Sequence, residues 1–536
     1  MNRATSSGSE SSPGPEPMSV PGLSWLHTSA FAVVVFVGLA VWSLASPLMS
    51  VPDEPAHAVK AASVWQGQLR GRSGDIDGIP VDRVRVPETF AKLSEIPPCY
   101  VFYPPNSAAC APGVTASGRI VESTTTAGPY PPLYYALVGW PSAVTASGTG
   151  VRLMRLTSAL VCALLVALAA RSLSRVVAAP LAVTAVVLAV TPTTYFISAG
   201  INPAGQEIAA AILFWCAGAA LTTSWTRERA LDRWQVAEVL IGFAFLALTR
   251  TLGLLFAGLA VVFVAAYAGR SRLRDLLSDR RAWWLAAPAV VITAVAGSWV
   301  LVNGHLDAVP GAPLGPDDRP LVYLGGVTDD FLRQMVAIFG WKDTGPVTQS
   351  VMPWLAATAA FISIGFLLTG TWRRLVLAAC VAAVVALPVL MQLDTLERDG
   401  FAWQGRYLLP FAVGVPVLSA LASSSAPAAL RSGLRSVCTS ITLLCAVGLT
   451  AGLWVWLHRV SVGIDGKALN PLHWGQWNPP IPAWALIATM AVIALVPVLY
   501  VSLSPELRVG SVDPADGVID GDGPRPGSGD PGALAA

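Results

Sequence analysis

Two adjacent carboxylates, Asp53 and Glu54, stand between two prolines in the stretch SVPDEPAHAVK, a few residues after a long apolar run. Proline fixes its own φ angle and keeps the preceding residue out of the helical region, so the acids occupy a stiff corner. A carboxylate with an unperturbed pKa of about 4 is ionised at neutral pH and can accept a hydroxyl proton. The pair therefore predicts a general base or a metal ligand. The alternative is that one of them only caps the helix that follows.

Pro55 is suited to the first turn of a short helix that we expect to run to about Leu69. The free amide groups at the start of such a helix favour anions nearby. His57 and Lys60 are three residues apart and would share a face of it. We interpret these two side chains as candidate contacts for a phosphate group on a substrate.

The composition indicates that a membrane surrounds most of the elements that must position this corner. Of 536 residues, 54% are hydrophobic and 12% are charged, which is about half the charged fraction of a soluble domain. The net charge of +2 arises from 34 basic and 32 acidic residues. Without a basic field, a nucleic-acid partner is not expected.

Apolar segments recur at lengths close to the roughly 20 residues that a bilayer helix needs. They predict an all-α polytopic membrane protein of about 12 transmembrane helices, with a large first outer loop that carries juxtamembrane helices. Arginine clusters between segments place those connections in the cytoplasm by the positive-inside rule, together with both termini, and we expect a plasma-membrane location. The expected segments lie near residues 26–46, 152–170, 176–197, 206–224, 236–249, 252–268, 283–303, 350–370, 375–392, 406–424, 436–457 and 483–503.

The expected membrane domain spans residues 23–504, with outer loops at 47–151, 303–352, 392–405 and 458–483. The tails, 1–22 and 505–536, are rich in Pro, Gly and Ser or Asp, and we expect them to be disordered. The stretch Tyr130–Val144 is short and broken by Pro141, so it predicts an interfacial helix and not a span.

Cysteines and arginines add further candidates. Cys99 and Cys110 both lie in the first outer loop, where an oxidising compartment would allow a disulfide; two free thiols are the alternative. Arg406, in WQGRYLLP, and Arg250, in LTRTLG, fall at the outer ends of predicted spans. Guanidinium groups match phosphate oxygens, so both are candidate phosphate contacts, although snorkelling to the interface would also explain them.

Aromatic and acidic side chains of the other outer loops could contact a sugar. Trp341 and Asp343 stand in FGWKDT, Trp474 in LNPLHWGQW, and Tyr407 follows Arg406. The alternative for the tryptophans is an anchoring role at the membrane interface. Asp53, Glu54 and Asp343 are also candidate ligands of a divalent cation; oxygen ligands would favour Mg or Mn over zinc.

Five stretches, VPDEPAH, YPPLYY, SAGINPAGQE, FGWKDTGPV and WQGRYLLP, together resemble a bacterial multi-pass membrane family. This family is domain of unknown function twenty-one forty-two, which is similar to the GT-C glycosyltransferases. The resemblance runs from Trp25 to about Pro497. One departure concerns the residue after Asn-Pro, commonly aspartate in the family and Ala204 here. Glu207, one helical turn further, could substitute for that aspartate or pair with a neighbouring arginine.

The resemblance implies a GT-C-like bundle that transfers a sugar from a polyprenyl-phosphate carrier to a cell-envelope glycan, glycolipid or protein on the outer face. It implies that an acidic residue of the first outer loop deprotonates the acceptor. By position this base is Asp53, with Glu54 as its alternate or as a metal ligand, and direct displacement would invert the anomeric carbon. Two alternatives are a transporter or flippase for a lipid-linked sugar, and a non-catalytic scaffold of the same fold.

Overall fold

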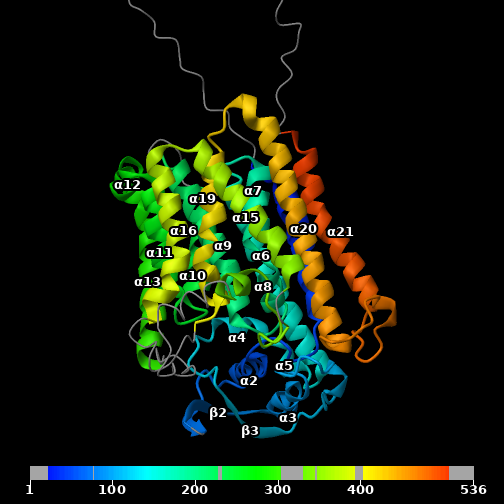
Figure 1. Cartoon of the computed structure of the whole chain (residues 1–536). Coiled ribbons are helices and arrows are strands. Elements are labelled where there is room, and N and C mark those ends of the chain that lie inside the picture. Colours follow the sequence, from blue (N-terminus) through cyan, green and yellow to red (C-terminus); the bar gives the residue numbers. More distant parts are fainter. Residues whose placement is uncertain are drawn as a thin grey trace, which may run out of the picture.

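The structure is a computed structural model, and it describes residues 22–76, 78–226, 232–303, 330–344, 347–392 and 403–505. A bundle of long helices makes up most of it, and a smaller folded unit packs on one end (Figure 1). Both expected tails lie outside the described residues, apart from Gly22 and Pro505. Most of the expected loop 392–405 and half of 303–352 also lie outside them.

Within the described ranges, nine helical stretches are long and apolar enough to cross a membrane, or eleven if each of two bent pairs counts as one span. The polytopic helical fold is therefore confirmed. The number of about 12 stays a prediction, because α10 has only 15 residues. The helices of the bundle are α1 (Trp25–Leu44), α6 (Gly148–Leu173), α7 (Ala179–Ala189), α8 (Pro192–Ser198), α9 (Pro203–Ser224), α10 (Arg233–Ala247), α11 (Gly253–Ala268), α12 (Arg270–Leu277), α13 (Trp283–Asn303), α15 (Thr348–Leu368), α16 (Thr371–Gln392), α18 (Leu409–Ala412), α19 (Gly414–Ser423), α20 (Arg431–Val462) and α21 (Ala483–Leu503).

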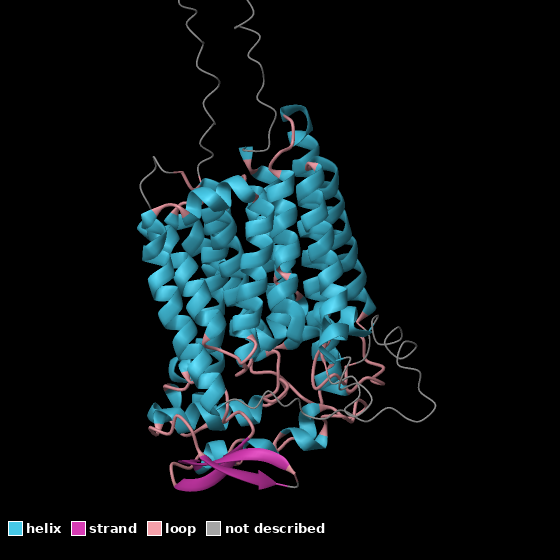
Figure 2. Ribbon diagram, turned by 90° about the vertical axis from the view of Figure 1, so that its left-hand side faces the viewer, coloured by secondary structure: helices cyan, strands magenta, loops and turns pink. Residues whose placement is uncertain are grey.

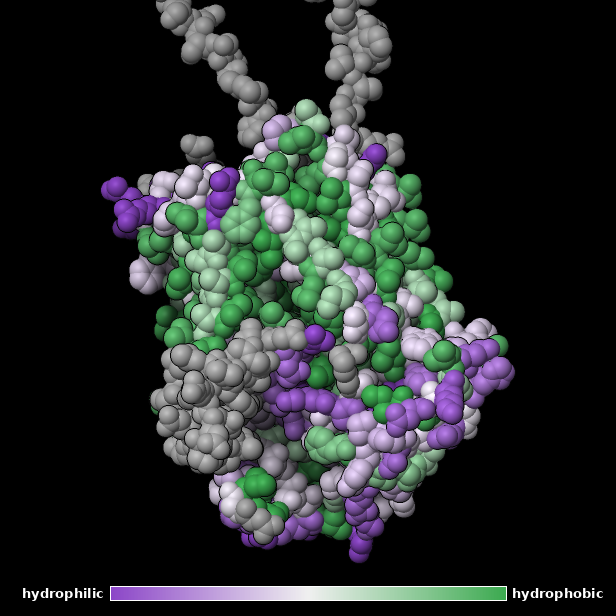
Figure 3. Space-filling view, viewed as in Figure 1, coloured by the Kyte–Doolittle hydropathy of each residue, from purple (hydrophilic) through white to green (hydrophobic). Residues whose placement is uncertain are grey.

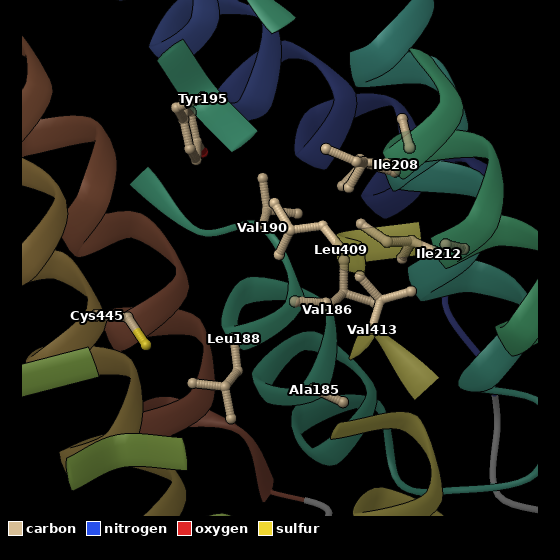
Figure 4. Close-up of a cluster of buried hydrophobic side chains, with 14 of the residues drawn as sticks. Ala185, Val186, Leu188, Val190, Tyr195, Ile208, Ile212, Leu409, Val413 and Cys445 are labelled. Atoms are coloured by element: carbon tan, nitrogen blue, oxygen red, sulfur yellow. The ribbon is translucent and has the colours of Figure 1, made fainter. Parts of the chain in front are cut away.

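Burial separates the central helices from those that face lipid. The most apolar window of α9 is 94% buried, whereas that of residues 280–303, which includes α13, is 6% buried. A helix that is apolar all round and unburied needs lipid as its solvent. Part of the central core is formed where residues of α7 and α9 meet Leu409 and Val413 (Figure 4).

One expected span is broken. Residues 176–197 were expected to form one helix, but α7 and α8 meet at a 70° bend. Thr191 caps α8 by accepting from the Thr194 amide, and Pro192 follows in its first turn. Proline lacks an amide hydrogen and so removes one hydrogen bond of a continuing helix, which together with the Thr191 cap favours a break here. The chain then turns at residues 199–202, and Asn202 caps the N-terminus of α9.

The unit at the end of the bundle is the α1–α6 loop, residues 45–147 (Figure 2). Most of a second hydrophobic core lies in it, and α6 adds Val151 and Met154. Its elements are α2 (Glu54–Trp65), β1 (Arg72–Ile76), β2 (Ile79–Pro87), α3 (Glu88–Ala91), β3 (Ile120–Thr125), α4 (Leu133–Val138) and α5 (Pro141–Val144), with three 3-10 turns at Leu93–Glu95, Pro97–Cys99 and Ala108–Cys110. The short helices α4 and α5 confirm that the stretch Tyr130–Val144 does not form a long span.

A three-stranded antiparallel sheet, in the order β1-β2-β3, was not predicted from the sequence. Arg72 pairs with Arg83 and Val84 with Ser123. On β2, Val84 and Val86 are buried while Arg85 between them is exposed, so one face of the sheet packs into the loop core. The hydroxyl of Thr125 donates to the carbonyl of Ala56 at 2.7 Å, which joins the sheet to α2.

The bundle end opposite the α1–α6 loop carries α12 and the connections around it (Figure 1). Arg171 and Arg175 pair there with Glu238, and Arg171 lies over the ring of Trp25. Apolar surface covers the bundle between this end and the polar α1–α6 loop end (Figure 3). Such a belt between two polar ends is the surface of a multi-pass membrane protein.

Candidate active site

Asp53 lies at the N-terminus of α2 with φ of 62°, in the left-handed region that Asp tolerates better than most residues. Its side chain is 51% exposed. It makes no capping hydrogen bond to α2, so the interpretation of Asp53 as a cap is wrong. The side-chain amide of Asn202 donates to the carbonyl of Pro52 at 2.8 Å, and a side chain at Gly200 would clash with Val51. The acidic corner, Val51–Glu54, is therefore fixed against the start of α9, and the carboxylate of Asp53 stays half exposed.

Glu54 has different surroundings. It is fully buried and forms two 2.6 Å hydrogen bonds with Arg155 of α6. The amide of Ile201 also donates to it at 3.0 Å. Arg155 directs its other donors to the carbonyls of Ser43, Ser46 and Pro47. These contacts give Glu54 a structural role that joins α1, α6 and the acidic corner, and they leave it badly placed as an alternate base.

His57 and Lys60 are also buried. The ring Nδ1 of His57 and the hydroxyl of Tyr135 are 2.9 Å apart and share a hydrogen bond. Burial, with the charges of Arg250 and Arg406, lowers the pKa of His57 to about 3, so the ring is neutral at pH 7. Lys60 donates to the carbonyls of Leu69 and Gly128, and burial lowers its pKa to about 8. These contacts hold the loop together and occupy both side chains, so neither is free to bind a phosphate.

Arg406 reaches the acidic corner from the far end of the chain. It lies in a 3-10 turn, Gly405–Leu408, and its Nη2 is 3.3 Å from Oδ2 of Asp53. The guanidinium group also lies 5.2 Å from the ring of Tyr407. The structure thus brings Arg406, a candidate phosphate contact, beside Asp53.

Arg250 stands beside them, in the turn between α10 and α11. Its guanidinium carbon is 5.7 Å from the ring of Tyr130 and 5.2 Å from that of Tyr407. Glu207 of α9 forms an ion pair with Arg250 at 2.9 Å. Pairing with an arginine was one of the two alternatives predicted for Glu207. The guanidinium groups of Arg250 and Arg406 therefore both lie against the ring of Tyr407. The carboxylate that pairs with Arg250 is buried, whereas the one that pairs with Arg406 is half exposed.

Trp341 and Asp343 contact the α1–α6 loop at Phe102. Asp343 accepts from the amide of Phe102 at 3.0 Å and from Arg459 of α20 at 3.1 Å. Trp341 packs edge-to-face on Phe102, with ring centroids 6.0 Å apart. Asp343 is thus engaged in the fold, whereas Trp341 borders open space.

Trp474 is buried: it donates to the carbonyl of Ala468 and packs on His458 and Trp454. The expectation that it contacts a sugar has no support from this position. The disulfide expected between Cys99 and Cys110 is confirmed.

The acidic residues do not fit a divalent cation. Within the described part of the chain, no three His, Cys, Asp or Glu side chains gather closely enough to hold a metal. Glu54 and Asp343 are each committed to an arginine. Asp53 alone retains exposed oxygen atoms, and one carboxylate is a poor site for Mg or Mn, which need several oxygen ligands.

An open cleft of about 690 Å³, called the loop cleft below, begins at Asp53 and runs through the α1–α6 loop. Its volume lies in the range of about 300–1,000 Å³ that holds small ligands. The described residues that line it are Asp53, Pro55, Ala56, Val59, Val81, Ala91, Ser94, Pro97, Pro98, Val101, Phe102, Tyr103, Ser123, Thr124, Thr125, Thr126 and Trp341.

The sequence comparison decides the family. A family model described as "Predicted membrane protein (DUF2142)" matches residues 36–415. The chain belongs to this family. No curated protein sequence matches it significantly.

Solved structures similar to this DUF2142 protein include ArnT from Cupriavidus metallidurans. Bound to undecaprenyl phosphate, ArnT aligns with a TM-score of 0.43 and 13% identity over 90% of this chain and 78% of its own. Its apo state gives 0.44 and 12% over 89% and 78%. Arabinofuranosyltransferase AftD from Mycobacteria gives 0.39 and 18% over 83% of this chain and 28% of its own.

Several residues of the DUF2142 site were missed from the sequence. Arg155 lies inside a predicted span, where the cost of a buried charge predicts a partner. Tyr130 and Tyr135 belong to the quoted stretch YPPLYY and its surroundings, but no role followed from it. Arg459 lies near the end of α20, just beyond the expected span 436–457, so its sequence position did not predict a buried partner. Their partners lie about 100 or more residues away in the sequence, so only the fold reveals them.

Proposed function

We propose that this protein is a membrane glycosyltransferase that moves a sugar from a polyprenyl-phosphate carrier to a cell-envelope acceptor. One observation carries the proposal. Asp53 keeps a half-exposed carboxylate on a fixed corner, 3.3 Å from Arg406 on one side and open to the loop cleft on the other. Transfer of a sugar from a phosphate carrier requires a base that lies between cations for the phosphate, here Arg406 and Arg250, and a cleft for the acceptor.

The reaction would proceed as one displacement. The carboxylate of Asp53 takes the proton of an acceptor hydroxyl, and the oxygen atom forms a bond to the anomeric carbon. The bond from that carbon to the phosphate oxygen breaks, and the polyprenyl phosphate leaves with the electron pair. Attack opposite the leaving group inverts the anomeric configuration. Because the leaving group is already a phosphate, this step needs one carboxylate, unlike the pair that glycoside hydrolysis uses.

Arg406 and Arg250 are the proposed phosphate contacts. They stand at the end of the bundle where the apolar belt meets the α1–α6 loop, the depth at which a carrier with its chain in the bilayer presents its phosphate. Charge-assisted hydrogen bonds from guanidinium groups to phosphate are stronger than neutral ones. Tyr407 and Tyr130 hold the two guanidinium groups through their ring faces.

The orientation follows from the arginines at the other end. The end that carries α12 would face the cytoplasm by the positive-inside rule, so the α1–α6 loop and its disulfide face outward across the plasma membrane. Both termini are then cytoplasmic.

The test is transfer of radiolabelled sugar from polyprenyl-phosphate donors to envelope extract, with purified protein in lipid nanodiscs. Asp53→Asn is compared with wild type and with Glu122→Gln, an exposed acid of β3 that does not line the loop cleft. We expect Asp53→Asn to lose about 10²–10⁴-fold of the rate, as removal of a general base does, and Glu122→Gln to retain it. Transfer that survives in Asp53→Asn would remove Asp53 as the base.

Binding without transfer would support the alternatives. If wild type binds a polyprenyl phosphate through Arg406 but transfers no sugar from any donor, a flippase or a non-catalytic scaffold becomes the better conclusion. Movement of the lipid-linked sugar between leaflets of a vesicle then separates these two.

A further inference from the structure

The loop cleft is built almost entirely by the α1–α6 loop, with Trp341 as the single contribution from elsewhere among its described lining residues. No residue of α6–α13 or α15–α21 lines it. Its ligand therefore reaches it from the aqueous side, whereas the arginines that suit a carrier phosphate stand against the bundle. The two substrates of the proposed transfer would meet at Asp53 from different sides.

The chemistry of the cleft wall is neutral. Among the described lining residues there is no Lys, Arg or His, and Asp53 is the one charged side chain. Ser123 and Thr124 of β3, and Thr126 just after the strand, line a part of the cleft that is called the hydroxyl wall below. Prolines and aromatic residues line other parts of it. An anionic ligand would find no counter-charge there, and a cationic one would find only Asp53, which is already paired with Arg406.

The backbone conformation and the exposure of Phe102 indicate most clearly that the cleft binds a ligand. Its φ is 62°, a region that costs a residue with a large side chain about 1–3 kcal/mol, and the side chain gains little from packing because the residue is 66% exposed. The four described non-glycine residues with positive φ are Met49, Asp53, Phe102 and Lys342. Two of them line the cleft, and Lys342 follows Trp341, which also lines it. The backbone is strained around one cleft.

Three contacts hold Phe102 in this conformation. Its amide donates to Asp343, which Arg459 holds from α20. Arg459 also donates to the carbonyls of Tyr100 and Tyr103 on either side of it. The disulfide between Cys99 and Cys110 closes the same segment. An exposed aromatic ring is thus fixed in place in a cleft that hydroxyl-bearing residues also line.

We infer that the loop cleft is the acceptor site and that it takes a neutral carbohydrate chain, an inference that rests on the proposed function. Sugar rings present apolar C–H faces, which suit the rings of Phe102 and Trp341, and hydroxyl edges, which suit the side chains of β3. The terminal sugar of the carbohydrate would place one of its hydroxyl groups at Asp53. A lipid acceptor would need an opening among the spans, and a charged peptide would need the counter-charges that the wall lacks.

Acceptor binding is tested without any sugar donor, so that its outcome is independent of catalysis. Full-length protein in nanodiscs is applied to a broad array of neutral, anionic and cationic oligosaccharides, and binding is quantified for the best ligand. We expect neutral oligosaccharides to bind. Binding of charged oligosaccharides alone, or of none, would overturn the inference while leaving the radiolabel assay of Asp53 unaffected.

Two variants locate the binding. Phe102→Ala removes the exposed ring, and loss of one central aromatic contact costs about tenfold in affinity or more. Thr124→Trp fills the cleft from the hydroxyl wall and should abolish binding. The control is Ile79→Ala, an exposed apolar residue of the same loop that does not line the cleft. If the variants bind like the control, the cleft is not the site.

A kinetic measurement adds a readout that misfolding would not imitate. In the transfer assay, Phe102→Ala should raise KM for the acceptor and leave KM for the polyprenyl-phosphate donor unchanged. An equal rise for both substrates would overturn the separation of the two sites. Carrier binding by the variant, measured directly, serves as the folding control.

Discussion

Asp53 and Glu54 are adjacent carboxylates that the structure treats in opposite ways, and a paired substitution exposes the difference. Glu54→Gln keeps the size of the side chain but removes the charge that balances Arg155. Asp53→Asn makes the same chemical change one residue earlier. We expect the first to damage stability and the second to damage activity alone.

The magnitudes follow from burial. Neither side chain of the Glu54–Arg155 pair is exposed, and removal of one partner of a buried pair costs about 3–5 kcal/mol because the other charge stays uncompensated. Asp53 is half exposed and only 3.3 Å from one guanidinium nitrogen. A pair of this kind contributes about 0–1 kcal/mol. The two variants should therefore differ by at least about 2 kcal/mol in the free energy of unfolding.

The assay is a denaturant titration in mixed micelles, followed by circular dichroism, with wild type and both variants side by side. The double variant Glu54→Met, Arg155→Met removes both charges and should recover part of the loss. Recovery stays partial because the carbonyls of Ser43, Ser46 and Pro47 lose their donor. Equal stability of the two single variants would refute the structural role of Glu54.

Three further outcomes are expected. Wild type should lose stability as pH falls from about 6.5 to 3, because the unfolded chain binds a proton at His57 that the folded chain does not. This proton lowers the free energy of unfolding by about 1.4 kcal/mol per pH unit. His57→Asn should therefore show a flatter acid profile in unfolding titrations, and an unchanged profile would contradict the neutral ring. Cys99→Ser should lower stability by about 2–4 kcal/mol, since the disulfide with Cys110 closes a short loop; the same melting temperature with and without reductant in wild type would argue against it. Asp343→Asn should increase proteolysis of the segment around residue 102, detected by mass spectrometry, because Arg459 loses its partner; unchanged cleavage would mean that the remaining carbonyl contacts suffice.

Much of the bundle could be predicted because lipid imposes a simple requirement on sequence. A stretch such as Ala483–Leu503 must be long and apolar, and it is visible without any neighbour. The break between α7 and α8 was less accessible. Pro192 marked it, but proline is tolerated in many membrane helices, as Pro288 and Pro497 are here.

The α1–α6 loop was harder to predict because its elements are short and are stabilised by contacts with one another. Strand β1, RSGDI, has no apolar alternation of its own and exists through its pairing with β2. The site shows the same limit. Asp53 and Arg406 were identified by residue type and by position at a span end, whereas the roles of Glu54, Lys60 and Asp343 depend on partners that only the fold supplies.

Arg459 binds the carbonyl of Asn106, which precedes it by 353 residues. A ribosome that adds about 5–20 residues per second would need roughly 20–70 s to cover that distance. During this time the α1–α6 loop has been synthesised, but the segment around Phe102 lacks its contact with Arg459. A separation of 353 residues also lies between Asp53 and Arg406. A nascent or truncated chain therefore holds an incomplete site, and the finished arrangement reports that nearly the whole protein has been made and inserted.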